Sequence, residues 1–446
     1  MATRPGRRAG EPPDMRGCSA VPRAVQGLGD PPWRRPAAVS HCRCCGAPLT
    51  EPFADLGMAP LPTAYVPPEN AAAIEPHYPL RALVCSDCRL VQLAAVENAP
   101  AMLPEEPGGA RIPATSPGAA EVFGCRMMER LHLGSQTPVL LLASDDDRLL
   151  RCFLGAGIPV LGRDGLVPAV QAAIARGTAP EAAEFGAARA RWLRATRPAP
   201  ALILAGDILA HAVDLHDVIA GVRILLAPGG VAVFEVQHLL PLMRNNAFDS
   251  IHHGRQAYLS VLVAELILGQ HGLTVFDAEE LPGDAGSLRL FVRHVEDTSK
   301  PVTAEIERIR AEEREAGLEG RDAYARFAAR VVEAKCALLD FLTGAYRGGR
   351  RVVAYGALAR GNTLLNYCSV GPELLPFTVD RDPEKQGMLL PGTRIPVRAP
   401  TALVEEKPDF VLILPWHQRD AVMEQLAAVR RWGGRFVAPI PTLEVL

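Results

Sequence analysis

The pattern of hydrophobic and polar positions changes character along the chain. From about residue 120, short apolar runs of strand length alternate with longer segments in which apolar residues recur every three or four positions. Strands are expected at residues 138–142, 159–162, 201–205 and 230–235, and helices at 148–155 and 215–226. This alternation predicts a parallel sheet flanked by helices, which is a doubly wound α/β domain, at residues 120–300.

The last hundred residues repeat the alternation on a smaller scale. Strands are expected at 351–355, 376–380, 409–414 and 435–439, with helices between them, which predicts a second, smaller Rossmann-like domain at 348–446. Before it, residues 303–346 are expected to be helical. One apolar face is made by residues at helical spacing: Phe327, Val331, Ala334, Leu338 and Leu342. We therefore expect connector helices at 301–347, packed between the two domains.

Four cysteines near the start of the chain are paired by their spacing. Cys42 and Cys45 form one C-x-x-C, and Cys85 and Cys88 form a second. Two such pairs can supply four thiolates to one tetrahedral Zn²⁺ and leave no open position for a substrate, so the site would be structural. Redox pairs or incidental cysteines are the alternative, and Cys44 is an alternative ligand by register. The expected zinc module covers residues 41–97.

Two segments lack a periodic hydrophobic pattern. Residues 1–40 are rich in Arg, Pro and Gly and lack the apolar core of a secretion signal, so we expect a disordered tail; translation could equally begin at Met15. Residues 98–119 contain prolines that exclude a continuous helix, which predicts a linker or a loop over a site.

Composition excludes several classes of protein. The 446 residues are 48% hydrophobic and 22% charged, which is typical of a folded globular chain. The 47 Lys and Arg residues against 50 Asp and Glu residues leave no electrostatic footprint for nucleic acid. No apolar run reaches the ~18 residues of a membrane span. Ten cysteines without a secretion signal indicate a reducing cytoplasm.

In an open α/β sheet, ligands bind beyond the carboxyl ends of the strands. In the middle domain the first such turn, Ala143 to Asp147, contains no glycine, although glycine usually lets the backbone approach a cofactor there. The second strand is followed by Asp164, which could hold two ribose hydroxyls or could equally be a solvated loop carboxylate.

The last domain offers a clearer turn. Its first strand leads through Gly356 into a helix whose start carries Arg360, Asn362 and Thr363, where exposed N–H groups and the helix dipole would meet a phosphate. Arg360 would act as a charged clamp. The next strand ends at Asp380, and Lys385 follows it. These residues predict a nucleotide or diphosphate site, although the small residues could serve helix–sheet packing alone.

From about His41 to Leu446 the chain resembles the sugar C-methyltransferases, which place a methyl group on C3 of a dTDP-4-keto-deoxysugar in secondary-metabolite pathways. The resemblance is carried by Cys42 to Gly46, Phe53 to Gly57, Cys85 to Leu93, Leu209 to His211, Phe248 to Ile251, His271 to Asp277, Gly286 to Arg289 and most of Val352 to Leu446. It implies a zinc module, a class I methyltransferase-like domain that binds S-adenosylmethionine, and a C-terminal domain that helps to hold the nucleotide sugar.

The resemblance also implies the roles of individual residues. The family's base lies in a Tyr-His-Glu-His run, which here reads His252-His253-Gly254-Arg255, so His253 and His252 are the candidate catalytic residues. Arginine cannot act as a base near neutral pH. The family's cofactor turn keeps only Ser144 and Asp146; together with Ala143 and Asp164 these are the candidate cofactor-binding residues.

Three hypotheses follow from these departures. The chain is an active methyltransferase with a rearranged catalytic set, or a catalytically degenerate protein that binds a nucleotide sugar or a partner, or a C3 epimerase that needs no S-adenosylmethionine. The sequence departs from the family pattern at positions assigned to methyl transfer, whereas residues 348–446 keep it. A nucleotide sugar is therefore the expected small-molecule partner, with no nucleic acid and no membrane.

Overall fold

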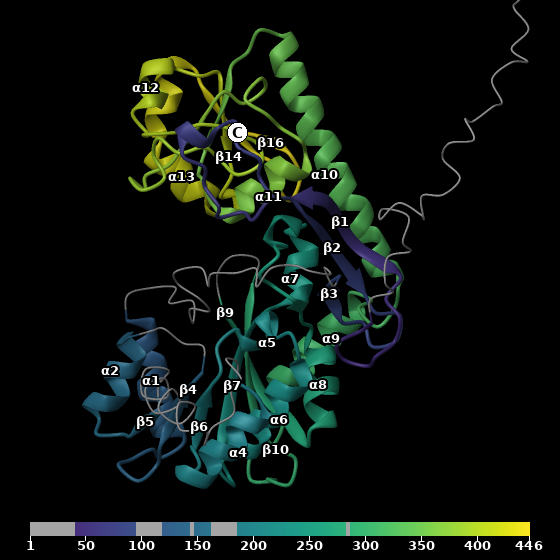
Figure 1. Ribbon diagram of the computed structural model, residues 1–446, viewed down its shortest axis with the longest axis vertical. Coiled ribbons are helices and arrows are strands. Elements are labelled where there is room, and N and C mark those ends of the chain that lie inside the picture. The colour runs from purple at the N-terminus through teal and green to yellow at the C-terminus, as the bar shows by residue number, and fades with distance from the viewer. Residues whose placement is uncertain (1–40, 95–117, 143–146, 162–184, 282–285) are drawn as a thin grey trace, which may run out of the picture. The chain divides into compact units, whose positions relative to one another are not determined.

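The computed structural model describes residues 41–94, 118–142, 147–161, 185–281 and 286–446 (Figure 1). The expected tail at 1–40 and nearly all of the expected linker lie outside this part, as do the candidate cofactor residues Ala143, Ser144, Asp146 and Asp164. Within the described residues, no helix has the length and apolar character needed to cross a membrane.

The middle sheet has six strands in the order β5-β4-β6-β7-β10-β9. Their bounds are β4 (Val139–Leu141), β5 (Val160–Leu161), β6 (Leu202–Leu204), β7 (Val231–Gln237), β9 (Leu273–Leu281) and β10 (Ser287–His294). The first four in this order are parallel, and β10 runs antiparallel to both of its neighbours. Because the chain starts at β4 and continues to both sides of it, the sheet is doubly wound, as predicted.

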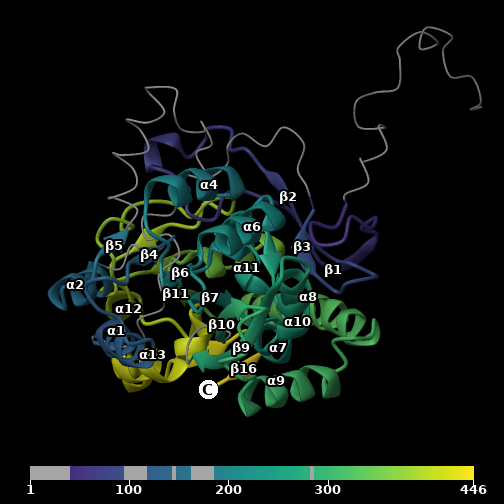
Figure 2. The same ribbon diagram turned by 90° about the horizontal axis from the view of Figure 1, so that it is seen from below.

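Helices cover both faces of the middle sheet (Figures 1 and 2). Helices α1 (Ala119–Arg130) and α2 (Asp147–Gly155) share one hydrophobic core with Phe276 and Phe291. The other face packs against helices whose bounds are α4 (Ala187–Thr196), α6 (Leu215–Leu225) and α8 (Val261–Gln270). The short helices α5 (Ile208–His211) and α7 (Leu239–Arg244) follow β6 and β7 and therefore lie at the carboxyl ends of the parallel strands.

The C-terminal sheet has the order β13-β12-β11-β14-β15-β16. The strands are β11 (Val352–Tyr355), β12 (Thr378–Val379), β13 (Val397–Arg398), β14 (Phe410–Ile413), β15 (Arg435–Ala438) and β16 (Glu444–Val445), and the helices are α11 (Ala359–Tyr367), α12 (Ala402–Glu406) and α13 (Arg419–Gln425). All strands but β16 are parallel. The winding reverses between β11 and β14, and such a switch point is where doubly wound sheets bind ligands.

The smallest sheet joins two distant parts of the sequence. Strands β1 (Glu51–Ala59), β2 (Tyr78–Val84) and β3 (Val91–Leu93) form an antiparallel sheet, and β8 (Ala257–Tyr258) adds to the edge at β3. Strand β8 begins two positions after Arg255, so the zinc module helps to fix the candidate catalytic run, residues 252–255. The sequence did not predict the pairing of β8 with β3, because β8 has only two residues and is too short to show an alternating hydrophobic pattern.

The connector is two helices with a break. α9 (Ala304–Glu315) packs against α8 and β9, whereas α10 (Asp322–Arg347) packs against β1 and β11. Gly317 in the loop between them has a φ of +83°, a conformation that glycine adopts at little cost. The expected apolar face of α10 is confirmed, since all five of its residues are buried. The expectation that residues 303–346 are helical is therefore wrong at 316–321, where the chain forms a loop.

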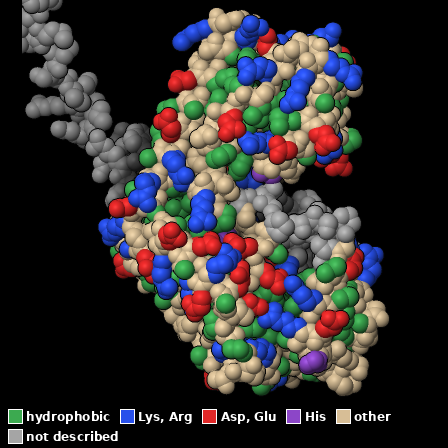
Figure 3. Space-filling view, turned by 180° about the vertical axis from the view of Figure 1, so that it is seen from behind, with side chains coloured by type: hydrophobic (Ala, Val, Ile, Leu, Met, Phe, Trp, Pro, Cys, Tyr) green, Lys and Arg blue, Asp and Glu red, His purple; other side chains and the backbone are tan. Residues whose placement is uncertain are grey.

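The surface mixes charges of both signs. On the face drawn in Figure 3, Lys and Arg side chains alternate with Asp and Glu side chains over the described residues. Ion pairs such as Arg310 with Glu265 and Arg308 with Glu305 account for part of this mixture. It fits the near-balanced composition and gives no support to a nucleic-acid surface on this face.

Candidate active site and zinc centre

The four cysteines predicted to bind zinc meet in one cluster. Their sulfur atoms all lie within 4.8 Å of one another, with Cys42 Sγ 3.4 Å from Cys88 Sγ and Cys45 Sγ 3.5 Å from Cys85 Sγ. The Gln92 side-chain amide donates a hydrogen bond to Cys42 Sγ at 3.1 Å. Four sulfur ligands with amide support are the donor set of a closed structural zinc site. Cys44, the alternative ligand, is buried beside the cluster but does not belong to it.

The thiol chemistry of the cluster favours a bound cation. A hydrogen bond with Cys88, together with burial, raises the pKa of Cys42 to about 12. Burial is the main cause that raises the pKa of Cys45 to about 11. Without a metal ion, the thiols of Cys42 and Cys45 would thus stay protonated near neutral pH, and a bound cation would stabilise them as thiolates. The donor set therefore fits Zn²⁺.

The candidate catalytic histidines lie at a narrow crevice where three parts of the chain meet. They follow the 3₁₀ turn Phe248–Ser250 and precede β8. The crevice is lined by Ala59, Pro60, Pro62, Leu80, His252, His253, Asn362, Thr363 and Asn366. Two candidate catalytic residues and two candidate substrate residues, separated by more than a hundred positions, therefore lie at one place.

His253 presents an unpartnered ring nitrogen. Its side chain is buried, and Nε2 lies 3.3 Å from the carbonyl oxygen of Tyr78, which fixes the proton on Nε2. Nδ1 is buried and has no partner among the described residues. Burial is the first cause that lowers the pKa of His253, so the ring is neutral and Nδ1 can accept a proton.

His252 has the same tautomer, but it is Nδ1 that is hydrogen-bonded to the backbone. Its Nδ1 accepts a hydrogen bond from the backbone N–H of Gly254 at 3.2 Å, so the ring proton is on Nε2. Burial, followed by the nearby guanidinium of Arg255, lowers the pKa of His252 to about 3. His252 is therefore a neutral hydrogen-bond donor near pH 7.

Arg255, where the resemblance expects a histidine, is paired with Asp207. Its Nη2 lies 2.6 Å and its Nη1 3.3 Å from the two carboxylate oxygens. His211 donates from Nδ1 to the carbonyl of Gly254 at 2.7 Å, and its Nε2 lies 3.6 Å from Asp207. Burial alone would raise the pKa of Asp207, but Arg255 and His211 outweigh it and the pKa lies below its usual value. The carboxylate is ionised.

Sequence reasoning missed Asp207. It stands three positions after the last residue of β6, beyond the carboxyl end of a central parallel strand. An acidic residue at that place was the available signal. Its partner, however, is 48 positions away, and nothing local to either residue reveals the pair.

The turn after β11 is closed by Asp380. Gly356 has a φ of +101°, and a Cβ there would lie 2.7 Å from Pro415 Cδ, so the position requires glycine. Asp380 accepts hydrogen bonds from the N–H groups of Ala357 at 2.6 Å and Asp382 at 2.9 Å. Asp380 thus shapes the turn at the switch point.

Arg360 is held by a carboxylate from the 3₁₀ turn before the candidate histidines. Its Nη2 lies 3.3 Å from Asp249, which is 1% exposed and also accepts a hydrogen bond from Trp416 Nε1 at 2.8 Å. Arg360 Nε is buried without a partner among the described residues. Nη1 also lies 3.4 Å from His417 Nδ1, so the guanidinium, at the start of α11, is left with Nε as an unused donor.

The other candidate substrate residues have partners within the fold. Asn362 donates to the carbonyl of Pro62 at 2.6 Å, and Thr363 donates to the carbonyl of Ala359 at 3.2 Å. Lys385 Nζ lies 3.6 Å from Asp382 and 5.7 Å from the ring centroid of Tyr65. Tyr65 in turn donates to the carbonyl of Ala357. A segment of the zinc module thus reaches the turn after β11.

Two stretches of the chain match described domain families. Residues 42–102, which include all four cluster cysteines, match the family described as "Putative zinc binding domain". Residues 282–441 match the family described as "C-methyltransferase C-terminal domain". The C-terminal part of the chain therefore resembles that of the C-methyltransferases.

A curated relative extends this likeness over nearly the whole chain. The chain is 29% identical to C-methyltransferase NovU of Streptomyces niveus over 414 residues, which cover 92% of this chain and 97% of the relative. Solved structures with partial likeness include a 1,6-didemethyltoxoflavin-N1-methyltransferase of Burkholderia thailandensis with bound S-adenosylhomocysteine, at 17% identity and a TM-score of 0.28 over 41% of this chain and 80% of the other. An S-adenosylmethionine-dependent methyltransferase of Clostridium acetobutylicum is 13% identical to this chain, with a TM-score of 0.29. The match covers 41% of this chain and 94% of the other.

Proposed function

We propose that this chain is a C-methyltransferase that uses S-adenosylmethionine to methylate the carbon next to the ketone of a dTDP-4-keto-deoxysugar. The observation that carries the proposal is the crevice at which His252 and His253 meet Asn362 and Thr363. Proton abstraction and nucleotide-sugar binding would then occur side by side.

The free cysteines of the described residues fit a reducing cytoplasm.

His253 is the proposed base. The C4 ketone acidifies the proton on C3, and Nδ1 of His253 takes this proton while the C–H electron pair moves into the C3–C4 bond and the carbonyl pair moves onto oxygen. A neutral, buried imidazole with a fixed tautomer suits this task because its lone pair needs no prior deprotonation. His252, as a neutral donor, would hydrogen-bond to the oxygen that becomes negative.

S-adenosylmethionine supplies the methyl group when it is bound. Ala143, Ser144, Asp146 and Asp164 remain the proposed cofactor residues, from their position after the first two strands of the middle domain.

The nucleotide would bind at the switch point of the C-terminal sheet. Gly356, Arg360, Asp380 and Lys385 gather around the ends of β11 and β12. Arg360 has an unused buried donor, and it lies on the first turn of α11, where the helix dipole favours a phosphate.

A second candidate function is a nucleotide-sugar binder or a C3 epimerase without methyl transfer. The ion pair of Arg255 with Asp207 favours it, because an arginine replaces the second histidine of the family's run. An epimerase needs only a base and an enolate stabiliser, and His253 and His252 could supply both.

Three measurements on the zinc-loaded full chain separate these functions. Calorimetry with S-adenosylmethionine tests the cofactor, mass spectrometry of a dTDP-4-keto-6-deoxyhexose tests for the gain of one methyl group, and NMR in D₂O tests exchange of the C3 proton. Methyl gain supports the transferase, exchange with neither cofactor heat nor methyl gain supports the epimerase, and dTDP binding alone supports the binder. If dTDP and its sugars produce no heat and no reaction, the proposal is wrong.

A further inference from the structure

We propose that Arg255, oriented by Asp207, binds the C4 oxygen of the keto-sugar as the enolate forms. This inference rests on the proposed function and names a residue for it. The arginine that replaces a base would thus act as an electrophile in the same reaction.

The position of the pair is suited to ligand contact. Asp207 lies beyond the carboxyl end of β6, next to β4 at the point where the winding of the middle sheet changes direction. Arg255 reaches it from residues 252–255, the same segment that lines the crevice. Both side chains are 15% exposed, so they are shielded but accessible from the ligand end of the sheet.

The geometry leaves donors for a ligand. A guanidinium has five N–H groups, and the contact with Asp207 uses one N–H on each Nη. The others point away from this carboxylate, because the fork of the guanidinium is planar and rigid. Fixed donors of this kind stabilise an oxyanion without reorganisation at the moment of reaction.

Asp207 gives the arginine its orientation. The two-point contact fixes the guanidinium plane, and His211 next to Asp207 donates to the carbonyl of Gly254, the residue before Arg255. Asp207 also neutralises most of the positive charge. The pair would therefore recognise an oxygen with a developing negative charge, and would not attract every anion.

Arg255 also acts on His252. A permanent cation close to an imidazole opposes a second positive charge on it, and His211 and His253 act in the same direction while Asp207 opposes them. His252 thus stays a neutral donor beside a cationic donor. Two donors and one base, His253 Nδ1, would lie within four consecutive residues.

The step is a complete half-reaction. The C3–H bond breaks, its proton goes to His253 Nδ1, and its electron pair forms the C3–C4 double bond as the carbonyl π pair becomes the oxygen lone pair held by Arg255 and His252. Return of a solvent deuteron to C3 reverses the step. Exchange in D₂O therefore reports this step with no S-adenosylmethionine present.

Arg255→Gln is the decisive variant. We expect C3 deuterium exchange in a dTDP-4-keto-6-deoxyhexose to fall about 10²- to 10³-fold, with the Kd for dTDP unchanged, because the lost donor acts only on the developing oxyanion. Arg255→Lys should keep part of the rate, and Asp207→Asn should lose less than Arg255→Gln. The control is Arg310→Gln, which breaks a two-point Arg310–Glu265 pair of 20% and 22% exposure between α8 and α9; its exchange rate should match wild type.

The outcomes separate the two proposals. Exchange in Arg255→Gln at the wild-type rate overturns the role of Arg255 and leaves the proposed function intact. A wild-type chain that neither exchanges nor methylates overturns both. If Arg255→Gln fails to fold, Arg255→Lys is the deciding variant. Lysine keeps the positive charge but lacks the planar guanidinium, so C3 exchange at the full wild-type rate in Arg255→Lys overturns the inference.

Discussion

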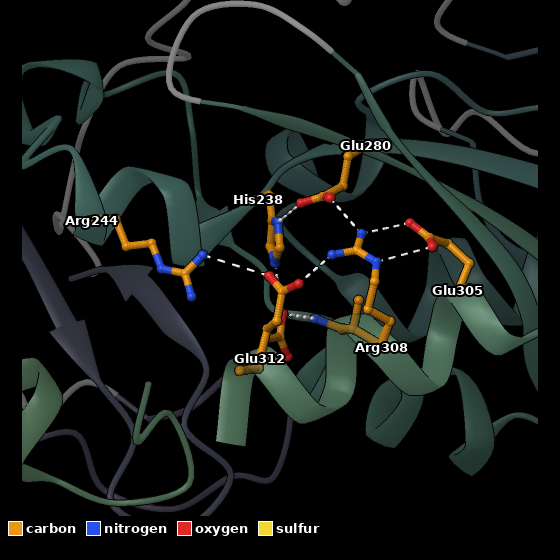
Figure 4. A network of polar contacts seen from close by, with 8 residues as sticks. His238, Arg244, Glu280, Glu305, Arg308 and Glu312 are labelled. Carbon is orange, nitrogen blue, oxygen red and sulfur yellow. Dashed lines mark hydrogen bonds and ion pairs between the residues drawn. The ribbon is translucent and has the colours of Figure 1, made fainter. Parts of the chain in front are cut away.

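His238 Nε2 lies 2.8 Å from a carboxylate oxygen of Glu313, and both side chains are buried. Glu313 also accepts the N–H groups of Val261 at 2.7 Å and Leu262 at 3.0 Å, at the start of α8. Around this pair, Figure 4 shows Arg308 between Glu280, Glu305 and Glu312, with Arg244 also reaching Glu312. One buried carboxylate thus joins α9, the start of α8 and the residue after β7.

We expect Glu313→Gln to lower the free energy of unfolding by about 2–3 kcal/mol. Glutamine has one acceptor oxygen where three N–H donors converge, so buried donors lose partners. Urea unfolding followed by circular dichroism measures the change. Glu305→Gln, which alters an exposed partner of Arg308, is the control and should change the free energy by less than about 0.5 kcal/mol. If both variants lower the free energy of unfolding by the same amount, the buried contacts of Glu313 contribute no more to stability than an exposed ion pair.

Zinc removal should loosen the loop between α9 and α10. Arg89 directly follows Cys88, donates to the carbonyls of Cys85 and Ser86, and donates from Nε to the carbonyl of Glu319 at 2.9 Å. The metal would hold the Cys85–Cys88 turn in shape and, through Arg89, the loop. Hydrogen exchange after chelation should rise in residues 316–321 and in β3 before it rises in β11.

The cysteines offer a matched pair for this experiment. Cys88→Ser should lose bound zinc, measured by metal analysis, and should reproduce the effect of the chelator on 316–321. Cys44→Ser, at a buried cysteine outside the cluster, should retain one zinc per chain. Zinc retention in Cys88→Ser, or zinc loss in Cys44→Ser, would contradict the ligand assignment.

Acid should destabilise the fold partly through His252. An unfolded histidine titrates near pH 6.5, whereas the pKa of His252 in the folded chain is about 3. Between these values only the unfolded chain takes up the proton, so the stability from neutral His252 is complete above pH 6.5 and is lost as the pH falls toward 3. The loss is about 1.4 kcal/mol per pH unit. In urea unfolding at pH 7.5 and 5.5, the free energy of unfolding should fall less between the two pH values for His252→Asn than for the wild type. Equal falls in the two proteins would contradict the lowered pKa of His252.

The sequence predicted most of the parallel strands but missed the antiparallel pair β9 and β10 of the middle sheet. The predicted strands β4, β6 and β11 are continuous apolar runs that are buried on both faces, a pattern that is easily recognised. Strand β10 buries Arg289 and Arg293 among apolar residues, so its sequence resembles a half-exposed segment. The burial of Arg289 becomes possible only through its pairing with Glu235, 54 positions away, which no local pattern reveals.

The candidate site divides in the same way. Sequence spacing predicted the four-cysteine cluster, because the two thiols of a C-x-x-C pair are close enough along the chain to bind the same metal ion. It named His252 and His253 by resemblance, but their tautomers depend on Tyr78 and on the backbone of Gly254, which only the fold brings into contact. Asp249 was noted as part of a resembling segment, and its contact with Arg360 links residues 111 positions apart.

Arg360 and Asp249 should affect dTDP binding in opposite directions. Asp249 competes with a phosphate for the guanidinium, so Asp249→Asn should raise dTDP affinity by up to about tenfold, while the loss of the charged partner lowers the stability of the fold. Arg360→Gln should weaken dTDP binding about tenfold and also lower stability, because it leaves Asp249 buried with Trp416 as its remaining side-chain donor. Calorimetry with dTDP measures both, and Arg398→Gln, which breaks an ion pair with Glu406 in the same domain, is the control. If the ion pair were purely structural, both variants would be less stable than the wild type and both would keep the wild-type affinity for dTDP. Lower stability in both variants, combined with weaker dTDP binding in Arg360→Gln and tighter binding in Asp249→Asn, would identify Arg360 as a phosphate ligand.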